Sequence, residues 1–208
     1  MRMLFTSCLL AAVVLGSCAR SGDDSPTAPG PVSSGLPIAT LVDVVPDVEV
    51  TAGGTGTWNW AGQSVTLPAA GRYGAIRFNW YTFKREPTAF GTLYVLDREY
   101  LGLPRDVGPS MPGFIAASER RENGQYVFPA SVTLEGSRTY WFYTDTQGAF
   151  AGSFDTDIYP GGDLYVSGYP TAPFRKTQAS GRMVNGEYVP PPPNVSLDAN
   201  FRLQGAGR

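Results

Sequence analysis

The sequence predicts an all-β fold, an antiparallel β-sandwich that follows an N-terminal targeting segment and a linker. From about residue 37 onward, short runs of β-branched and aromatic residues are separated by glycine, proline and Asn-Gly turns. The chain has 25 glycines and 18 prolines among 208 residues, and no stretch shows a helical period. A hydrophobic content of 42% supplies the apolar side chains for one ordinary core.

Each run of this composition is an expected strand. In chain order the expected strands are Leu41–Val45, Val48–Thr51, Thr57–Trp60, Ser64–Leu67, Tyr73–Thr82, Gly91–Leu96, Gly113–Ser118, Gln125–Phe128, Ser131–Leu134, Thr139–Asp145, Asp163–Ser167 and Val195–Leu203. Asn123-Gly124 and Asn185-Gly186 suit type I′ turns, because both central residues of such a turn need positive φ. The second turn predicts a small hairpin, which Pro190–Pro193 then ends with a polyproline connection.

Alternation along the strands separates core from surface. In the strand at 73–82 one parity is apolar, so that parity should face the core. The expected core side chains are Ile76, Phe78 and Trp80, and the expected outward ones are Arg77, Asn79 and Tyr81. Trp58 and Trp60 also share a face, and we expect both in the core.

Charge and the absence of histidine exclude several classes of function. The net charge is -2 and the basic residues are scattered, so we expect no nucleic-acid partner. Without histidine there is no Ser-His or Cys-His nucleophile pair and no His-zinc site. The sequence therefore assigns no catalytic residue, cofactor or metal ligand.

The first 18 residues have the pattern of an export signal. A basic N-terminus precedes an apolar run that is shorter than the roughly 20 residues needed to span a bilayer. The run ends in Leu-Gly-Ser-Cys at positions 15–18, which resembles the lipobox of bacterial lipoproteins. This resemblance implies cleavage after Ser17 and attachment of fatty acyl chains such as palmitate to Cys18. An ordinary secretory signal cut near Ala19 is the alternative.

This interpretation divides the chain into three parts: a signal peptide at 1–17, lipidated Cys18 with a flexible linker at 18–36, and one β-sandwich domain at 37–208. The acyl chains would anchor the protein to a membrane of the cell envelope without spanning it. Ala19, in the position after the lipidated cysteine, points by the same resemblance to the outer membrane in a source that has one. Cys8 is removed with the signal, so the mature chain has no disulfide.

The domain carries a second resemblance. The motifs that carry it are Gly91–Leu96, Pro112–Ala116, Val132–Gly136, Thr139–Trp141, Tyr159–Gly162 and Asp198–Phe201. Over roughly residues 60–204 their order is similar to the β-sandwich domains of "choice-of-anchor"-type exported bacterial proteins. The resemblance implies a jelly-roll-like sandwich and a backbone reason for Gly161 and Gly162. It transfers no catalytic residue.

The strand at 139–145 contains four successive aromatic residues, which place rings on both of its faces. Sugars stack on exposed aromatic rings, and a pair two residues apart is separated by about 6.5–7 Å. Trp141 and Tyr143 are the candidate ligand contacts, with Trp141 first, and Asp145 or Arg138 could add polar contacts. The alternative is that a loop, 98–112 or 146–162, covers this second face.

Carboxylate pairs are the remaining candidates for acid–base chemistry. A glycosidase places two carboxylates about 5–9.5 Å apart. Glu119 and Glu122 flank two arginines beside a turn, which indicates a solvated, self-paired hairpin end. Asp155, Asp157 and Asp163 could supply oxygens to calcium, whereas the alternative is an exposed acidic loop.

The sequence thus predicts a lipid-anchored, non-catalytic β-sandwich of the cell envelope, a monomer that binds a glycan or an envelope protein. The alternative is a polysaccharide-active enzyme that uses carboxylates or bound calcium. Two acidic side chains converging across a groove would favour the enzyme.

Overall fold

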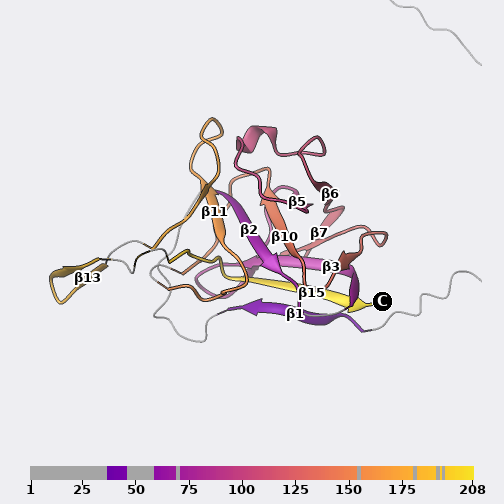
Figure 1. Cartoon of the computed structure of the whole chain (residues 1–208), viewed down its shortest axis with the longest axis horizontal. Helices are drawn as coiled ribbons and strands as arrows, with labels where there is room; N and C mark the ends of the chain where they lie inside the picture. Colours follow the sequence, from indigo (N-terminus) through magenta and orange to yellow (C-terminus); the bar gives the residue numbers. More distant parts are fainter. Residues whose placement is uncertain are drawn as a thin grey trace, which may run out of the picture. The chain divides into compact units, whose positions relative to one another are not determined.

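Figure 1 shows the computed structural model, which describes residues 37–45, 59–68, 71–153, 156–179, 182–190, 193 and 195–208, with no account of the side chains of 182–184. All of them belong to one compact unit, Gly35–Arg208. The signal, Cys18, the linker, Trp58 and the strand expected at Val48–Thr51 lie outside the described residues. Within these ranges no helix is long and apolar enough to cross a membrane.

The described strands form two antiparallel sheets and a separate hairpin. In order across the first sheet lie β1 (Ala39–Val44), β15 (Phe201–Gly207), β3 (Arg72–Tyr81), β8 (Gln125–Val127) and β7 (Arg120–Glu122), while β4 (Pro87–Thr88) and β9 (Leu134–Glu135) also pair with β3. Across the second lie β12 (Arg175–Lys176), β11 (Leu164–Ser167), β2 (Trp60–Thr66), β10 (Thr139–Thr144), β5 (Leu93–Leu96) and β6 (Phe114–Ala117). The hairpin is β13 (Arg182–Val184) with β14 (Glu187–Val189), and the short 3-10 helix η2 (Pro104–Asp106) lies between β5 and β6.

The strand order is that of a jelly roll. Its eight strands, in chain order, are β1, β2, β3, β5, β6, β8, β10 and β15. Numbered in that order, they run first–eighth–third–sixth across one sheet and second–seventh–fourth–fifth across the other. Two Greek keys wound together give this pattern, and Figure 1 shows β2 and β10 in one layer with β3, β15 and β1 in the other. The predicted fold class is confirmed.

The core lies between the two sheets. Ile76, Phe78 and Trp80 of β3 are each 0% exposed, as the alternation predicts. Phe78 stacks on Phe142 of the second sheet and on Phe201 of β15, with ring centroids 4.9 and 5.5 Å apart. Aromatic packing therefore joins the sheets at their centre.

The outward face of β3 differs from the prediction. Asn79 and Tyr81 are only 2% and 7% exposed. The guanidinium carbon of Arg202 lies 5.6 Å from the centre of the Tyr81 ring, and Arg202 Nη2 lies 2.7 Å from Asp43 Oδ2. The long Arg202 side chain of the neighbouring strand β15 thus lies over Tyr81. Trp60 also departs from the prediction, because it is half-buried against the outer face of the second sheet rather than in the core.

Both predicted Asn-Gly turns are present. Asn123 and Gly124 have φ of 50° and 73°, and Asn185 and Gly186 have φ of 53° and 85°. Positive φ at both central residues is what a type I′ turn requires. The turns join β7 to β8 and β13 to β14, so both hairpins form where the sequence predicts them.

Gly162 has a steric reason to be glycine. The amides of Ser64 and Thr66 donate to the carbonyl oxygens of Asp163 and Gly161, both at 2.9 Å, so this segment runs tightly along β2. A Cβ at Gly162 would lie 1.8 Å from the Ser64 carbonyl oxygen. Any larger residue would push the two backbones apart.

Candidate functional site

The aromatic rings of β10 divide between the two faces of the second sheet. Tyr140 and Phe142 belong to the core between the sheets. Trp141 and Tyr143 point to the outer face, where they join a second cluster of apolar side chains. The parity that lies outside the sandwich core is therefore Trp141 with Tyr143.

Two loops cover part of this outer face. The buried members of the second cluster are Leu96, Val107, Met111, Tyr143, Tyr165 and Phe174. Val107 and Met111 come from the β5–β6 connection, and Phe174 comes from the β11–β12 connection. The Phe174 amide donates to the Gly102 carbonyl oxygen at 3.0 Å, which holds the two loops together. Loop 98–112 thus covers part of the second face, as one of the sequence alternatives expected.

Tyr143 offers no ring face to a ligand. Its side chain is fully buried, and its hydroxyl accepts a hydrogen bond from the Tyr100 amide at 3.1 Å. Its ring lies over Gly62, where a Cβ would come within 2.4 Å of the ring. Burial also raises the pKa of the Tyr143 hydroxyl well above its ordinary value. Stacking on Tyr143, which requires an exposed ring, does not fit this burial.

Trp141 is half-buried against the same cluster and keeps part of its surface exposed. Its indole Nε1 donates to the Tyr165 hydroxyl at 3.3 Å, and that hydroxyl donates to Glu99 Oε1 at 2.8 Å. Burial raises the pKa of Tyr165 far above its ordinary value, so the hydroxyl stays protonated as a donor. These bonds fix the indole, and ligand contact at Trp141 stays a prediction.

Of the acidic residues considered for calcium, the structure describes Asp157 and Asp163, and each has another partner. Asp155 lies outside the described residues, and Asp163 Oδ1 pairs with Lys176 Nζ at 2.7 Å. Asp157 lies beside Asp198. In the described ranges, no group of three or more acidic, histidine or cysteine side chains could hold a metal ion.

Asp198 is a fully buried carboxyl group. Its Oδ1 accepts from Gln63 Nε2 at 3.0 Å, and the Tyr159 amide donates to Oδ2 of Asp198 and to Oδ1 of Asp157, both at 3.0 Å. Burial first, with the nearby Asp157 carboxylate adding to it, raises the pKa of Asp198 to about 7. Because the group is sealed from solvent, it bears on stability and not on a substrate.

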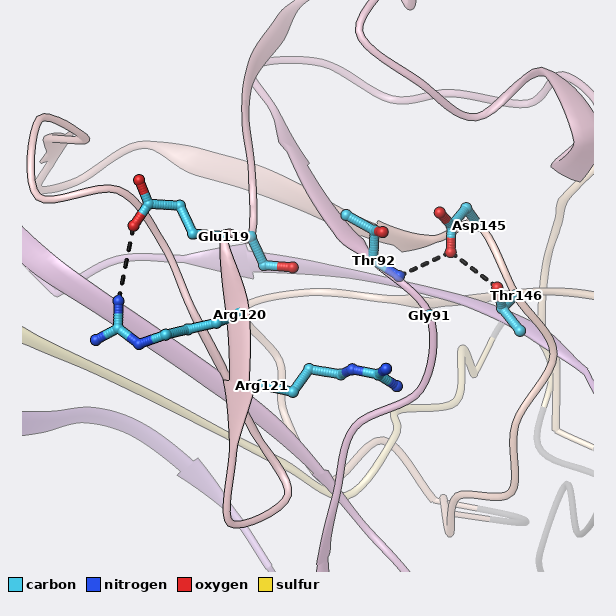
Figure 2. A pocket seen from close by; sticks show the side chains of 8 residues that line it. Gly91, Thr92, Glu119, Arg120, Arg121, Asp145 and Thr146 are labelled. Carbon is cyan, nitrogen blue, oxygen red and sulfur yellow. Dashed lines mark hydrogen bonds and ion pairs between the residues drawn. The ribbon is translucent and has the colours of Figure 1, made fainter. Parts of the chain in front are cut away.

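The described residues also form a polar pocket at one edge of the sandwich, shown in Figure 2. It has a volume of about 510 Å³. Its lining consists of glycine and polar residues only: Gly91, Thr92, Ser118, Glu119, Arg120, Arg121, Asp145 and Thr146. These residues come from the segment before β5, from the β6–β7 connection with the start of β7, and from the end of β10.

Gly91 allows one wall of the pocket to form. Its φ is +59°, and a Cβ there would lie 2.3 Å from Asp145 Oδ1. In the space left free, Asp145 Oδ1 accepts from the Thr92 amide at 2.8 Å and from the Thr146 hydroxyl at 2.9 Å. Glycine at 91 therefore brings the carboxylate and two neighbouring segments together.

Ser118 and Glu119 also line the pocket, and at these two residues the chain passes from the second sheet to the first. The Ser118 amide donates to the Leu93 carbonyl oxygen at 2.8 Å, whereas the next amide, of Glu119, donates to the Val127 carbonyl oxygen at 2.9 Å. Ser118 thus still pairs with the second sheet, and Glu119 already pairs with the first. This corner brings the chain into β7, the strand at the edge of the first sheet beside β8.

The two arginines of β7 point in opposite directions (Figure 2). Arg120 extends toward Glu119, with which it pairs at 3.7 Å, and it also pairs with Glu122 at 2.5 Å. This self-pairing is the one that the sequence predicts. Arg121 lies opposite Tyr126 in the ladder, so its side chain leaves β7 on the face that looks toward the second sheet. It is exposed and has no hydrogen bond or ion pair within the described part of the chain.

Two half-buried aromatic residues border the pocket through Asp145. The Tyr94 hydroxyl donates to Asp145 Oδ2 at 3.4 Å, and Trp60 Nε1 donates to the Asp145 carbonyl oxygen at 3.1 Å. Burial, followed by the negative charge of Asp145, raises the pKa of Tyr94 and keeps its hydroxyl protonated. Asp145 is therefore the junction between the polar pocket and the aromatic outer face.

Sequence reasoning found the parts of this pocket without assembling them. It places Asp145 at the end of the aromatic strand and the arginines at a charged hairpin end. The available signal is strand alternation, which places Arg120 on the same face as Glu122 and Arg121 on the opposite face. Nothing local in the sequence shows that residues 91, 121 and 145 line the same pocket.

A scan of family models and searches of curated proteins and of solved structures gave no match to this chain. The functional argument therefore rests on the residues and their geometry.

Proposed function

We propose that this protein is a lipid-anchored, non-catalytic protein of the cell envelope whose β-sandwich binds a glycan at the pocket around Asp145. The observation that carries the proposal is the junction at Asp145, which lines the polar pocket and also accepts hydrogen bonds from the half-buried Tyr94 and Trp60. Aromatic faces can pack against the C–H faces of a sugar ring while polar groups bond its hydroxyls.

The pocket offers both hydrogen-bond donors and acceptors, which suits the hydroxyl groups of a sugar. Among the described residues, Arg121 has no partner for its N–H groups, and Asp145 Oδ2 accepts only the long bond from Tyr94. The hydroxyl of Thr146 donates to Asp145 and has lone pairs left for a ligand. A sugar hydroxyl donates and accepts at once, so it can bridge such groups.

Trp141 is a second proposed contact. It lies on the outer face of β10, and Asp145, which directly follows that strand, is four residues away and thus about 13 Å along the chain. The covered Tyr143 lies between them. A contact at Trp141 would therefore add to binding of a longer glycan without forming part of the pocket.

The anchor is proposed from the sequence alone. The motif at positions 15–18 supports acylation of Cys18, and the polar linker that follows would hold the domain away from the membrane. The resemblance to choice-of-anchor-type domains supports the same envelope location.

A polysaccharide-active enzyme is the second candidate, because Glu119 and Asp145 both line the pocket. Asp145 accepts hydrogen bonds from Thr92 and Thr146, and Glu119 pairs with Arg120. These contacts give both carboxylates a structural role, which favours binding over hydrolysis. Release of reducing ends from a bound glycan, lost in Asp145→Asn, would favour the enzyme instead.

A glycan array probed with the purified protein tests the proposal. Thr146 is exposed and lines the pocket, so Thr146→Phe should fill the pocket and abolish binding. Ala149 is exposed on the same connection but outside the lining, so Ala149→Phe is the matched control and should bind normally. Binding to no glycan on the array, or equal loss in both variants, would contradict the proposed function.

A further inference from the structure

The charges around the pocket leave one cation without a partner. Arg120 is shared between Glu119 and Glu122, so it has no free charge to offer. Arg121, on the opposite face of β7, has no carboxylate within ion-pair distance in the described ranges. Placing a ligand over an unpaired guanidinium removes water from it, and that cost is offset best by an acceptor that carries a negative charge.

Asp145, which also lines the pocket, requires hydrogen-bond donors from a ligand. A carboxylate can only accept hydrogen bonds, and its present donors, Thr92, Thr146 and Tyr94, are all neutral. In Figure 2 the Arg121 side chain extends from β7 toward the side on which Gly91, Asp145 and Thr146 lie, and no bond is drawn between Arg121 and Asp145. A ligand that contacts both groups must therefore present an anionic acceptor to Arg121 and neutral donors to Asp145.

Building on the proposed glycan site, we infer that the bound sugar is a uronate. Its carboxylate pairs with Arg121 in the two-pronged geometry that a guanidinium favours, and its hydroxyls donate to Asp145. A sugar phosphate fits less well, because its second negative charge would need a second free cation and Arg120 is already paired. A single sugar ring that carries both a carboxylate and hydroxyl groups can supply the anionic acceptor for Arg121 and the donors for Asp145.

The test compares acidic oligosaccharides with their neutral counterparts by calorimetry on the purified protein. The probes are oligogalacturonate and oligoglucuronate, each beside the carboxyl-reduced oligomer of the same linkage and length, with dextran sulfate as a control for charge alone. The wild type should bind a uronate at least about tenfold more tightly than its reduced counterpart, the ratio expected for one charge-assisted hydrogen bond.

Three variants test whether the carboxylate of the sugar binds at Arg121. Arg121→Gln should remove the preference for the acidic probe. Arg121→Lys should keep part of the preference, because lysine retains the charge but lacks the paired N–H donors of the guanidinium. Arg175, also exposed and without an ion pair in the described ranges, is the matched control, and Arg175→Gln should retain the preference. Unchanged thermal unfolding of all three variants would show that the fold is intact.

The outcomes separate this inference from the proposed function. Equal binding of uronate and reduced oligomer, with loss of both in Thr146→Phe, would overturn the uronate and leave the glycan site standing. A preference that survives Arg121→Gln, or dextran sulfate binding as tightly as the uronates, would also overturn it. Binding of neither acidic nor neutral oligomers here or on the array would overturn both.

Discussion

The rings of Phe78 and Phe142, one from each sheet, stack with centroids 4.9 Å apart and planes inclined by 21°. Trp80 meets the edge of the same Phe78 ring at 4.7 Å. The centre of the sandwich is thus a continuous aromatic stack, and the stability of the fold should depend strongly on it.

Trp80→Ala should lower the free energy of unfolding by about 3–5 kcal/mol, because it empties a fully buried indole site. Urea unfolding followed by circular dichroism measures this loss. Tyr188, 64% exposed on the β13–β14 hairpin, provides the control, and Tyr188→Ala should change stability by less than about 0.5 kcal/mol. A loss below about 1 kcal/mol for Trp80→Ala would mean that the ring does not support the core.

The fold was predictable because its signals are local. The alternation of Ile76, Phe78 and Trp80 and the two Asn-Gly turns each depend on a few neighbouring residues. The pocket was not predictable, because it depends on contacts between residues far apart in the chain. Arg121 and Asp145 line the same pocket only because a sheet-to-sheet corner lies near the end of another strand. For the same reason, the covering of Tyr143 depends on Phe174, which belongs to a distant loop.

The buried Asp198 should make the protein more stable in mild acid. Its pKa rises from 3.8 to about 7 on folding, so the folded protein binds the proton more tightly than the unfolded chain does. The free energy of unfolding should therefore fall as the pH rises from about 4 to about 7, and the loss should be complete above that range. Urea unfolding at a series of pH values measures the slope.

The pH effect can be assigned with a variant of the exposed neighbour. Asp157 raises the pKa of Asp198, so Asp157→Asn should lower that pKa, flatten the slope and raise stability at pH 8 relative to wild type. Glu187→Gln, on the exposed hairpin, should leave the slope unchanged. If the free energy of unfolding changes with pH equally in Asp157→Asn and in wild type, the Asp157–Asp198 pair does not cause the pH dependence.

Cys18→Ser should abolish acylation and release the protein from membranes, because Cys18 is the residue that the lipobox-like motif assigns to the lipid. Cys8→Ser should leave the acylated product unchanged, since the same interpretation removes Cys8 with the signal. Metabolic labelling with a radioactive fatty acid, followed by membrane fractionation, distinguishes the two. Label that persists in the Cys18 variant would refute the lipid anchor.

The last prediction separates a ligand contact from a packing role at Trp141. The residue is half-buried and its Nε1 donates to Tyr165, so Trp141→Ala should destabilise the protein by about 1–2 kcal/mol, less than Trp80→Ala. That loss leaves most molecules folded, and glycan binding can still be measured.

If the exposed part of the indole stacks on a sugar, Trp141→Ala should abolish or strongly weaken binding of long oligosaccharides while the pocket still binds short ones. Trp141→Phe keeps an aromatic face but loses the hydrogen bond to Tyr165, so it should retain most of the binding and show some loss of stability. Calorimetry with oligosaccharides of increasing length, beside urea unfolding, reads out both effects. Unchanged binding of every length by folded Trp141→Ala would assign the ring to the second apolar cluster alone, because packing against the cluster contributes to stability and not to affinity.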